Sequence, residues 1–322
     1  MKKNFNYCIT GGSGFVGSNL VEYIYKKNDY NKIVCLVRKT SDTSFLKSFP
    51  VDIKVVEFNK PSTYEKYIKE CDYLFQLIGL TYGKNFDTFK YVNYKIAKNF
   101  FDLYLKHSDT IKGYFFMSSL AIVGPKKKDN RIENPNRISN LNPITKYGKS
   151  KLLGEKIHWK YLNKNLNINI LRAPSIYGKR DKEMKQFFDL IKKGVAPIIG
   201  RGNNKFTIIN VTDLVKFIYY ITINKDTHGI FYIYDDNIYT MNTFAKKSKT
   251  IINKKALKVK IPKFLVYIAA FINEKISKDY IFNRDKYMEL TAESWAYKKN
   301  DFFIINKNKP KSLKEGLIEL YR

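Results

Sequence analysis

The sequence predicts an α/β fold, in which a doubly wound parallel sheet is joined to a smaller, interwoven C-terminal lobe. Short apolar runs alternate with longer helical patterns through the first half of the 322-residue chain, and this alternation is typical of β-α-β units. A glycine-rich turn follows the first apolar run. After residue 173 the elements become shorter, and glycine and proline punctuate them more often. Both changes indicate a regular sheet followed by a less regular lobe.

The first half of the chain accounts for the regular part of the fold. Thr212 precedes Asp213 and an apolar run that ends at Ile223, so we expect it to cap a helix in the second half. Six strands are expected at residues 5–10, 32–37, 53–57, 73–78, 113–117 and 167–171, and four helices at residues 14–27, 62–69, 87–107 and 144–163.

The composition indicates a globular protein of a reducing compartment. Hydrophobic residues make up 44% of the chain and aromatic residues 16%, which argues against disorder. The three cysteines are far apart and the three histidines share no ligand spacing, so we expect a cytoplasmic protein without a metal site. The longest apolar run, residues 264–272, is shorter than the ~20 residues that cross a bilayer. We interpret it as a core helix of the small lobe.

The formal net charge of +30 is the one extreme value. It allows two interpretations: a surface for nucleic acid or an anionic membrane, or the lysine bias of an AT-rich genome. Lysines are scattered along the expected helices and arginine is scarce, whereas nucleic-acid surfaces favour arginine forks. We therefore favour codon bias and expect no specific nucleic-acid binding, with peripheral membrane contact left open as the less favoured alternative.

A phosphate-binding loop is predicted between the first strand and the first helix. Glycines there permit a tight turn and close approach of a pyrophosphate to the positive end of the helix. The loop comprises Thr10, Gly11, Gly12, Ser13, Gly14, Phe15, Val16 and Gly17. The second strand ends in Arg38 and Lys39 instead of the acid that holds the ribose of NAD. Arg38 suits a 2′-phosphate, so NADP is favoured over NAD.

Tyr147 and Lys151 are four residues apart, and so lie on one face of the fourth expected helix. A cation near a phenol favours the phenolate and lowers its pKa towards the working range of an acid/base. Ser118 and Ser119 leave the fifth strand at its carboxyl end, where open sheets bind ligands.

These motifs resemble the extended short-chain dehydrogenase/reductase superfamily, often called the NAD-dependent epimerase/dehydratase family. The similarity also includes residues 77–81, Asn93, residues 171–178 and residues 200–213. It implies a Rossmann-type NAD(P)-binding domain over residues 1–173 and a substrate-binding lobe over residues 174–322, with parts of 205–235 returning to the first domain. A cytoplasmic homodimer that acts on a small molecule is expected.

The resemblance also implies roles for individual residues. Ser119 would hydrogen-bond the reacting oxygen, Tyr147 would be the general acid/base, and Lys151 would hold the nicotinamide ribose. Asn93 would support the helix that carries the lysine, and Thr81 would contact substrate. The remaining cofactor contacts would come from the phosphate loop, Arg38, Glu57, Leu77, Ile78, Gly79, Pro174, Ser175 and Ile176.

Two positions depart from the family pattern. Glu57 stands where an aspartate normally touches the adenine, and Phe206 stands where sugar-nucleotide enzymes carry an arginine for the diphosphate. Phe206 together with Arg38 favours an NADP-linked reductase or dehydrogenase of the dihydroflavonol reductase or hydroxysteroid dehydrogenase kind, acting on an apolar carbonyl or alcohol. A nucleotide-sugar epimerase or dehydratase with tightly retained NAD is the alternative.

Overall fold

The computed structural model describes residues 4–125, 141–276, 282–297, 299–304 and 309–321. Its centre is a seven-stranded parallel sheet in the order β11-β6-β5-β4-β1-β2-β3. The strands of this sheet are β1 (Phe5–Thr10), β2 (Tyr30–Val37), β3 (Asp52–Val55), β4 (Tyr73–Gln76), β5 (Gly113–Ser119), β6 (Ile168–Ala173) and β11 (Gly229–Phe231). All six expected strands are present, and the sheet has the doubly wound α/β topology that we predicted.

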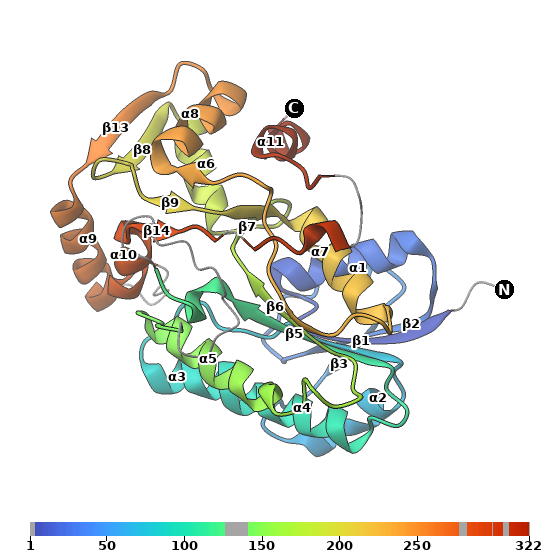
Figure 1. Ribbon diagram of the computed structural model, residues 1–322. Coiled ribbons are helices and arrows are strands. Elements are labelled where there is room, and N and C mark those ends of the chain that lie inside the picture. Colours follow the sequence, from blue (N-terminus) through green and yellow to red (C-terminus); the bar gives the residue numbers. More distant parts are fainter. Residues whose placement is uncertain (1–3, 126–140, 277–281, 298, 305–308, 322) are drawn as a thin grey trace.

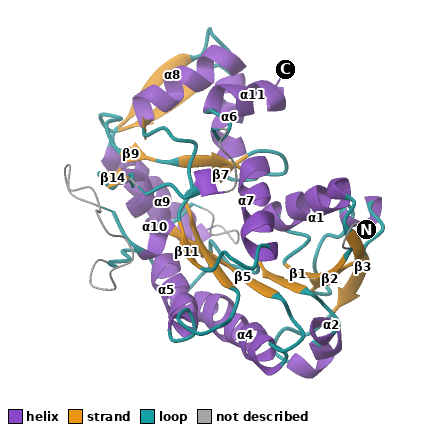
Figure 2. Cartoon of the chain, turned by 45° about the vertical axis from the view of Figure 1, so that its right-hand side comes forward, coloured by secondary structure: helices purple, strands orange, loops and turns teal. Residues whose placement is uncertain are grey.

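Helices cover both faces of this sheet, as Figures 1 and 2 show. One face packs against α1 and α7, and the other against α2, α4 and α5. The helices of these two layers are α1 (Phe15–Lys27), α2 (Glu65–Lys69), α3 (Phe86–Lys90), α4 (Ala97–Lys106), α5 (Lys146–Trp159) and α7 (Val211–Ile223). Because α7 and β11 follow residue 205, part of the second half of the chain completes the sheet and its helical layer.

Two local details differ from expectation. The long helix expected at residues 87–107 is divided into α3, a π-helical turn η3 (Tyr91–Ile96) and α4. The cap of α7 is Asn210, whose side-chain oxygen accepts from the amide of Thr212 at 2.9 Å. Thr212 is therefore the second residue of the helix and not its cap. Asn210 takes the capping position because its side chain accepts the hydrogen bond from the otherwise free amide of Thr212.

The C-terminal lobe is built from short strands and helices around a separate aromatic cluster, which includes Tyr177, Phe188, Tyr239 and Phe244. Its strands are β7 (Ser175–Tyr177), β8 (Val195–Ile199), β9 (Lys205–Phe206), β10 (Ile208–Asn210), β12 (Tyr239–Thr240), β13 (Leu257–Ile261) and β14 (Ser294–Trp295). Its helices are α6 (Met184–Lys192), α8 (Met241–Ile252), α9 (Lys263–Ile276), α10 (Arg284–Thr291) and α11 (Leu313–Tyr321).

Helix α9 contains the apolar run that we expected in the core, and that expectation is wrong. Only Val266 and Ala270 of this helix are buried. The remaining apolar side chains are at least partly open to solvent, from Phe271 at 37% to Ile276 at 79%. The run is apolar at almost every position, so its sequence does not reveal which side of the helix is covered. In the structure the C-terminal lobe packs against one side of α9 only. No helix of the described residues is long and apolar enough to span a membrane.

Close packing of α5 against η3 positions the helix that carries Tyr147. A Cβ atom at Gly154 would lie 2.1 Å from the carbonyl oxygen of Asn93, so only glycine permits this approach.

We expect Gly154→Ala to lower the free energy of unfolding by about 1–3 kcal/mol, because the overlap with backbone outweighs the better helix propensity of alanine. Chemical denaturation measures the change. Lys156→Ala is the matched control, because Lys156 is exposed on the same helix and its removal should alter stability by less than about 0.5 kcal/mol. Equal stabilities for the two variants would contradict the packing argument.

Candidate active site

The loop between β1 and α1 has the geometry of an anion site. Gly11 has a φ of +72°, which glycine adopts readily, and its carbonyl accepts from the amide of Gly14 at 2.9 Å. A Cβ atom at Gly17 would lie 2.2 Å from that carbonyl oxygen, so glycine is needed for the helix to approach the loop. The start of α1 has neither a side-chain cap nor an acidic residue in its first turn. Its positive end is therefore left for a ligand, and the cradle fits a pyrophosphate.

The end of β4 lies against this loop. The amide of Leu77 donates to Oγ1 of Thr10 at 3.2 Å, and a Cβ atom at Gly11 would lie 3.2 Å from the nitrogen of Ile78. The structure thus brings residues 77 and 78, which we expected near the cofactor, beside the phosphate loop.

Arg38 and Glu57 lie on the surface after β2 and β3. The guanidinium of Arg38 forms no hydrogen bond or ion pair with another described residue, while the Arg38 backbone is held in a turn by Ser41. The Glu57 carboxylate pairs with Lys60 at 2.8 Å. Arg38 is therefore free to meet a ligand, whereas Glu57 is already engaged by a surface lysine.

The three residues expected to carry the chemistry converge at the carboxyl end of β5. Ser119 ends that strand, and Thr145 caps α5 by accepting from the amide of Gly148 at 3.0 Å. This start places Tyr147 and Lys151 on one face of the helix. The Ser119 hydroxyl hydrogen-bonds the Tyr147 phenol, and the Lys151 ammonium donates to the carbonyl of Met117 on β5.

Asn93 links the helix of Lys151 to the loop after β4. Its Nδ2 donates to the carbonyl of Leu80 and to Oγ of Ser150, both at 2.9 Å, and its Oδ1 accepts from the amide of Leu80 at 2.8 Å. Gly79 lies between these groups, since a Cβ there would be 3.5 Å from Asn93 Oδ1 and 3.8 Å from Lys151 Nζ. The π-helical turn brings the buried Asn93 to this position, and such turns often occur at functional sites.

The pKa values of the two central groups are strongly shifted. Burial raises the pKa of the Tyr147 phenol to about 12, against a lowering by the Ser119 hydrogen bond. Burial also lowers the pKa of the Lys151 ammonium to about 7, although Glu155 opposes this. The shift of the tyrosine is opposite to the one that we expected from Lys151, because desolvation of the phenolate outweighs the attraction of nearby cations.

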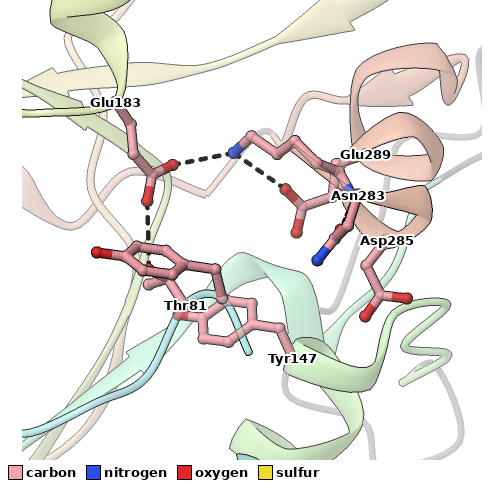
Figure 3. Close-up of a pocket in the computed structure, with 8 residues that line it drawn as sticks. Thr81, Tyr147, Glu183, Asn283, Asp285 and Glu289 are labelled. Atoms are coloured by element: carbon pink, nitrogen blue, oxygen red, sulfur yellow. Dashed lines mark hydrogen bonds and ion pairs between the residues drawn. The ribbon is translucent and has the colours of Figure 1, made fainter. Parts of the chain in front are cut away.

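A small pocket opens beside Tyr147 and is lined mostly by polar groups (Figure 3). Lys286 lies between two carboxylates, at 3.0 Å from Glu183 and 3.3 Å from Glu289. Thr81, which we expected at the substrate, donates to the other oxygen of Glu183 at 3.2 Å. Burial lowers the pKa of Lys286, but the carboxylates more than offset this and hold it above its usual range. Tyr82, Asn283 and Asp285 complete the lining.

Sequence analysis did not find Glu183, Lys286 or Glu289. They lie in the C-terminal lobe, on or just before α6 and on α10, and no motif marks them in a lysine-rich chain. The only local signal is the Asn283 cap of α10, whose side chain accepts from the amide of Lys286 at 2.9 Å. Pro174, Ser175 and Ile176 lie at the start of the lobe, where β7 begins directly after β6.

The low pKa of Lys151 makes a testable contribution to stability. Unfolded, the lysine regains an ordinary pKa near 10.5. Between that value and about 7 the unfolded chain therefore holds a proton that the folded chain has released, and stability rises with pH.

We expect the difference in unfolding free energy between wild type and Lys151→Met to grow by up to about 1.4 kcal/mol per pH unit above about pH 7, and to be flat below it. Denaturation of the cofactor-free proteins measures this difference. Lys149→Met, at an exposed position of the same helix, should show no such trend. A flat difference for Lys151→Met would mean that the lysine is not desolvated.

Comparison with known proteins agrees with this geometry. An Escherichia coli O157:H7 protein, N-acetyl-alpha-D-glucosaminyl-diphospho-ditrans,octacis-undecaprenol 4-epimerase, is 24% identical over 282 residues, or 85% of this chain and 81% of its own. UDP-glucose 4-epimerase of Thermotoga maritima, solved with UDP-glucose, superposes with a TM-score of 0.75 at 19% identity over 97% of this chain and 96% of its own.

The dTDP-glucose 4,6-dehydratase of Bacillus anthracis, solved with NAD, has a TM-score of 0.74 at 18% identity, covering 98% of this chain and 94% of its own. These structures share the Rossmann-type fold of the extended short-chain dehydrogenase/reductase superfamily. Residues 7–233 match the NAD dependent epimerase/dehydratase family, and the chain belongs to that family.

Proposed function

We propose that this protein is a nicotinamide-dependent enzyme that oxidises and re-reduces a sugar carbon, as an epimerase or dehydratase of diphosphate-linked sugars does. The observation that carries the proposal is the polar character of the side chains beside Tyr147, which enclose only a small space. Carboxylates, a lysine and an asparagine can accept and donate hydrogen bonds to the hydroxyls of a sugar ring. A steroid or flavonoid would cover these charged and polar groups without offering them hydrogen bonds, at a cost in desolvation. The polar lining thus favours a nucleotide-sugar epimerase or dehydratase, which was the alternative in the sequence analysis, over a reductase or dehydrogenase of apolar substrates.

The named relatives support the same substrate class. Their names specify a sugar joined through a diphosphate to a nucleoside or to a polyprenol. Phe206 packs with Tyr239 and Phe244 in the aromatic cluster of the lobe, so it offers no charge to a diphosphate. In our proposal, other cationic side chains of the C-terminal lobe bind the diphosphate of the substrate.

The residues around Tyr147 divide the chemistry between them. The phosphate loop would hold the pyrophosphate of the dinucleotide, and the bound cofactor would supply the hydride acceptor and donor. Tyr147 takes the hydroxyl proton during oxidation and gives it back during reduction, while Ser119 holds the same oxygen. With a pKa of about 12 the phenol is protonated at neutral pH, which suits the reductive half. For the oxidative half the Lys151 ammonium is the charge that stabilises the phenolate.

Tyr147→Phe tests this assignment because it removes only the hydroxyl. With UDP- or dTDP-linked hexoses as substrates, we expect turnover to fall by roughly 10²-fold or more, with unchanged cofactor affinity. Product analysis by NMR and cofactor titration measure the two effects. Tyr25→Phe, at an exposed position of α1 outside this pocket, is the matched control and should retain activity. Wild-type turnover of apolar ketones, with none of nucleotide sugars, would overturn the proposal.

A second candidate, an NADP-linked reductase or dehydrogenase, is favoured by Arg38. Its guanidinium lies after β2 and has no hydrogen-bonding or ionic partner in the described part of the chain, and a 2′-phosphate would supply one.

Arg38→Ala decides which cofactor is used. If NADP is the cofactor, its affinity should fall by roughly tenfold to a hundredfold, since a charge-assisted hydrogen bond is worth about 1.5–3 kcal/mol, while NAD binding changes little. Calorimetric titration with both dinucleotides measures this, and Lys39→Ala is the neighbouring control. If NAD binds tightly and with the same affinity to wild type and to Arg38→Ala, the result supports the epimerase or dehydratase assignment and argues against the NADP-linked reductase.

A further inference from the structure

We propose that the outer face of β13 and α9, residues 257–276, is a docking surface for an anionic phospholipid bilayer. The surface lies at the margin of the C-terminal lobe, where β13 runs directly into α9 (Figure 1). This inference concerns where the protein resides and is independent of the reaction proposed above.

The apolar part of the surface is the exposed side of α9. Phe264 is 63% exposed, and Leu265, Ile268 and Ile272 are each nearly half exposed. Leaving so many large apolar side chains in water on one short segment is costly for a soluble surface, and such patches mark interaction sites.

The buried side of α9 is already occupied, and this fixes which side is available. The ring of Tyr267 meets that of Tyr287 on α10 at 5.3 Å between centroids. Asn273 donates to the carbonyl of Phe282 at 2.6 Å, and Glu274 pairs with Arg284 at 2.7 Å. The same contacts attach α9 to α10, the helix that lines the pocket beside Tyr147.

The charge around the surface identifies its partner. Residues 237–273 contain eight lysines and not one aspartate or glutamate. Within the surface, Lys258, Lys260 and Lys263 are exposed, and none of the three forms an ion pair with another described residue. The Lys263 ammonium donates to the carbonyl of Thr291 at 3.0 Å. Codon bias explains many lysines, but it does not explain the loss of every acid from this stretch. Exposed apolar side chains flanked by lysines are typical of segments that lie in the headgroup layer of anionic membranes.

A second copy of the chain fits this surface less well. Self-pairing would bring the lysines of two copies together, and like charges in contact are destabilising. The one acid of the surface, Glu274, is already paired with Arg284. Nucleic acid could pair its phosphates with the lysines, but it offers no apolar surface to cover the exposed aliphatic side chains. An anionic bilayer offers acyl chains to the exposed apolar side chains and charged headgroups to the lysines.

Vesicle sedimentation with the full chain tests the proposal. Wild-type protein should sediment with phosphatidylcholine vesicles that contain phosphatidylglycerol, and far less with phosphatidylcholine alone. Lys258→Glu/Lys260→Glu should lower the partition coefficient by roughly tenfold or more, because each lysine at the membrane contributes substantially. Lys66→Glu/Lys69→Glu, on α2, changes the net charge equally and should stay within about twofold.

The apolar part is tested separately. Phe264→Ser/Ile268→Ser/Ile272→Ser should reduce binding to the anionic vesicles by roughly tenfold or more, while Phe264→Leu/Ile268→Leu/Ile272→Leu should retain it. Circular dichroism establishes that each variant is folded. Failure of wild type to bind anionic vesicles would overturn the proposal, as would equal effects of the two charge reversals. A wild-type dimer that the serine variant converts to monomer, with vesicle binding unchanged, would assign the surface to a second copy.

Discussion

The buried ion pair between Glu155 on α5 and Arg172 on β6 is the constraint on which the candidate site depends. Two nitrogens of the arginine donate to one carboxylate oxygen, at 3.0 and 2.6 Å, and Ser118 on β5 donates to the other oxygen. Removing one partner of a pair so fully buried typically costs about 3–5 kcal/mol. The pair fixes α5 over the ends of β5 and β6, and so sets where Tyr147 and Lys151 stand relative to Ser119.

The cofactor half of the site could be predicted from sequence because its residues follow strands. Thr10, Leu77 and Ser119 each stand where a parallel strand ends, and such ends meet at one edge of a sheet. The substrate half could not be predicted, since Glu183 and Lys286 are about a hundred residues apart and only the fold of the lobe brings them together. The apolar run of α9 was misplaced for a related reason: composition indicates that a segment is apolar, whereas tertiary structure decides whether anything covers it.

The pocket and the surface of α9 share one element. Helix α10 contributes Lys286 and Glu289 to the pocket on one side and Tyr287 to the contact with α9 on the other. The residues that line this pocket are therefore held in part by contacts with α9, the helix whose outer side is exposed. The sheet, by contrast, has helices on both faces.

Strand β13 carries a consequence of its own. Among the described strands it pairs only with β8, so its other edge presents unpaired amides and carbonyls. An open edge of this kind is a template for the addition of a further strand and for aggregation. Lys258 and Lys260 alternate along it with Leu257, Val259 and Ile261, and charged side chains in an edge strand discourage that addition. The lysines of β13 would thereby keep an unusually apolar segment from assembling into fibrils.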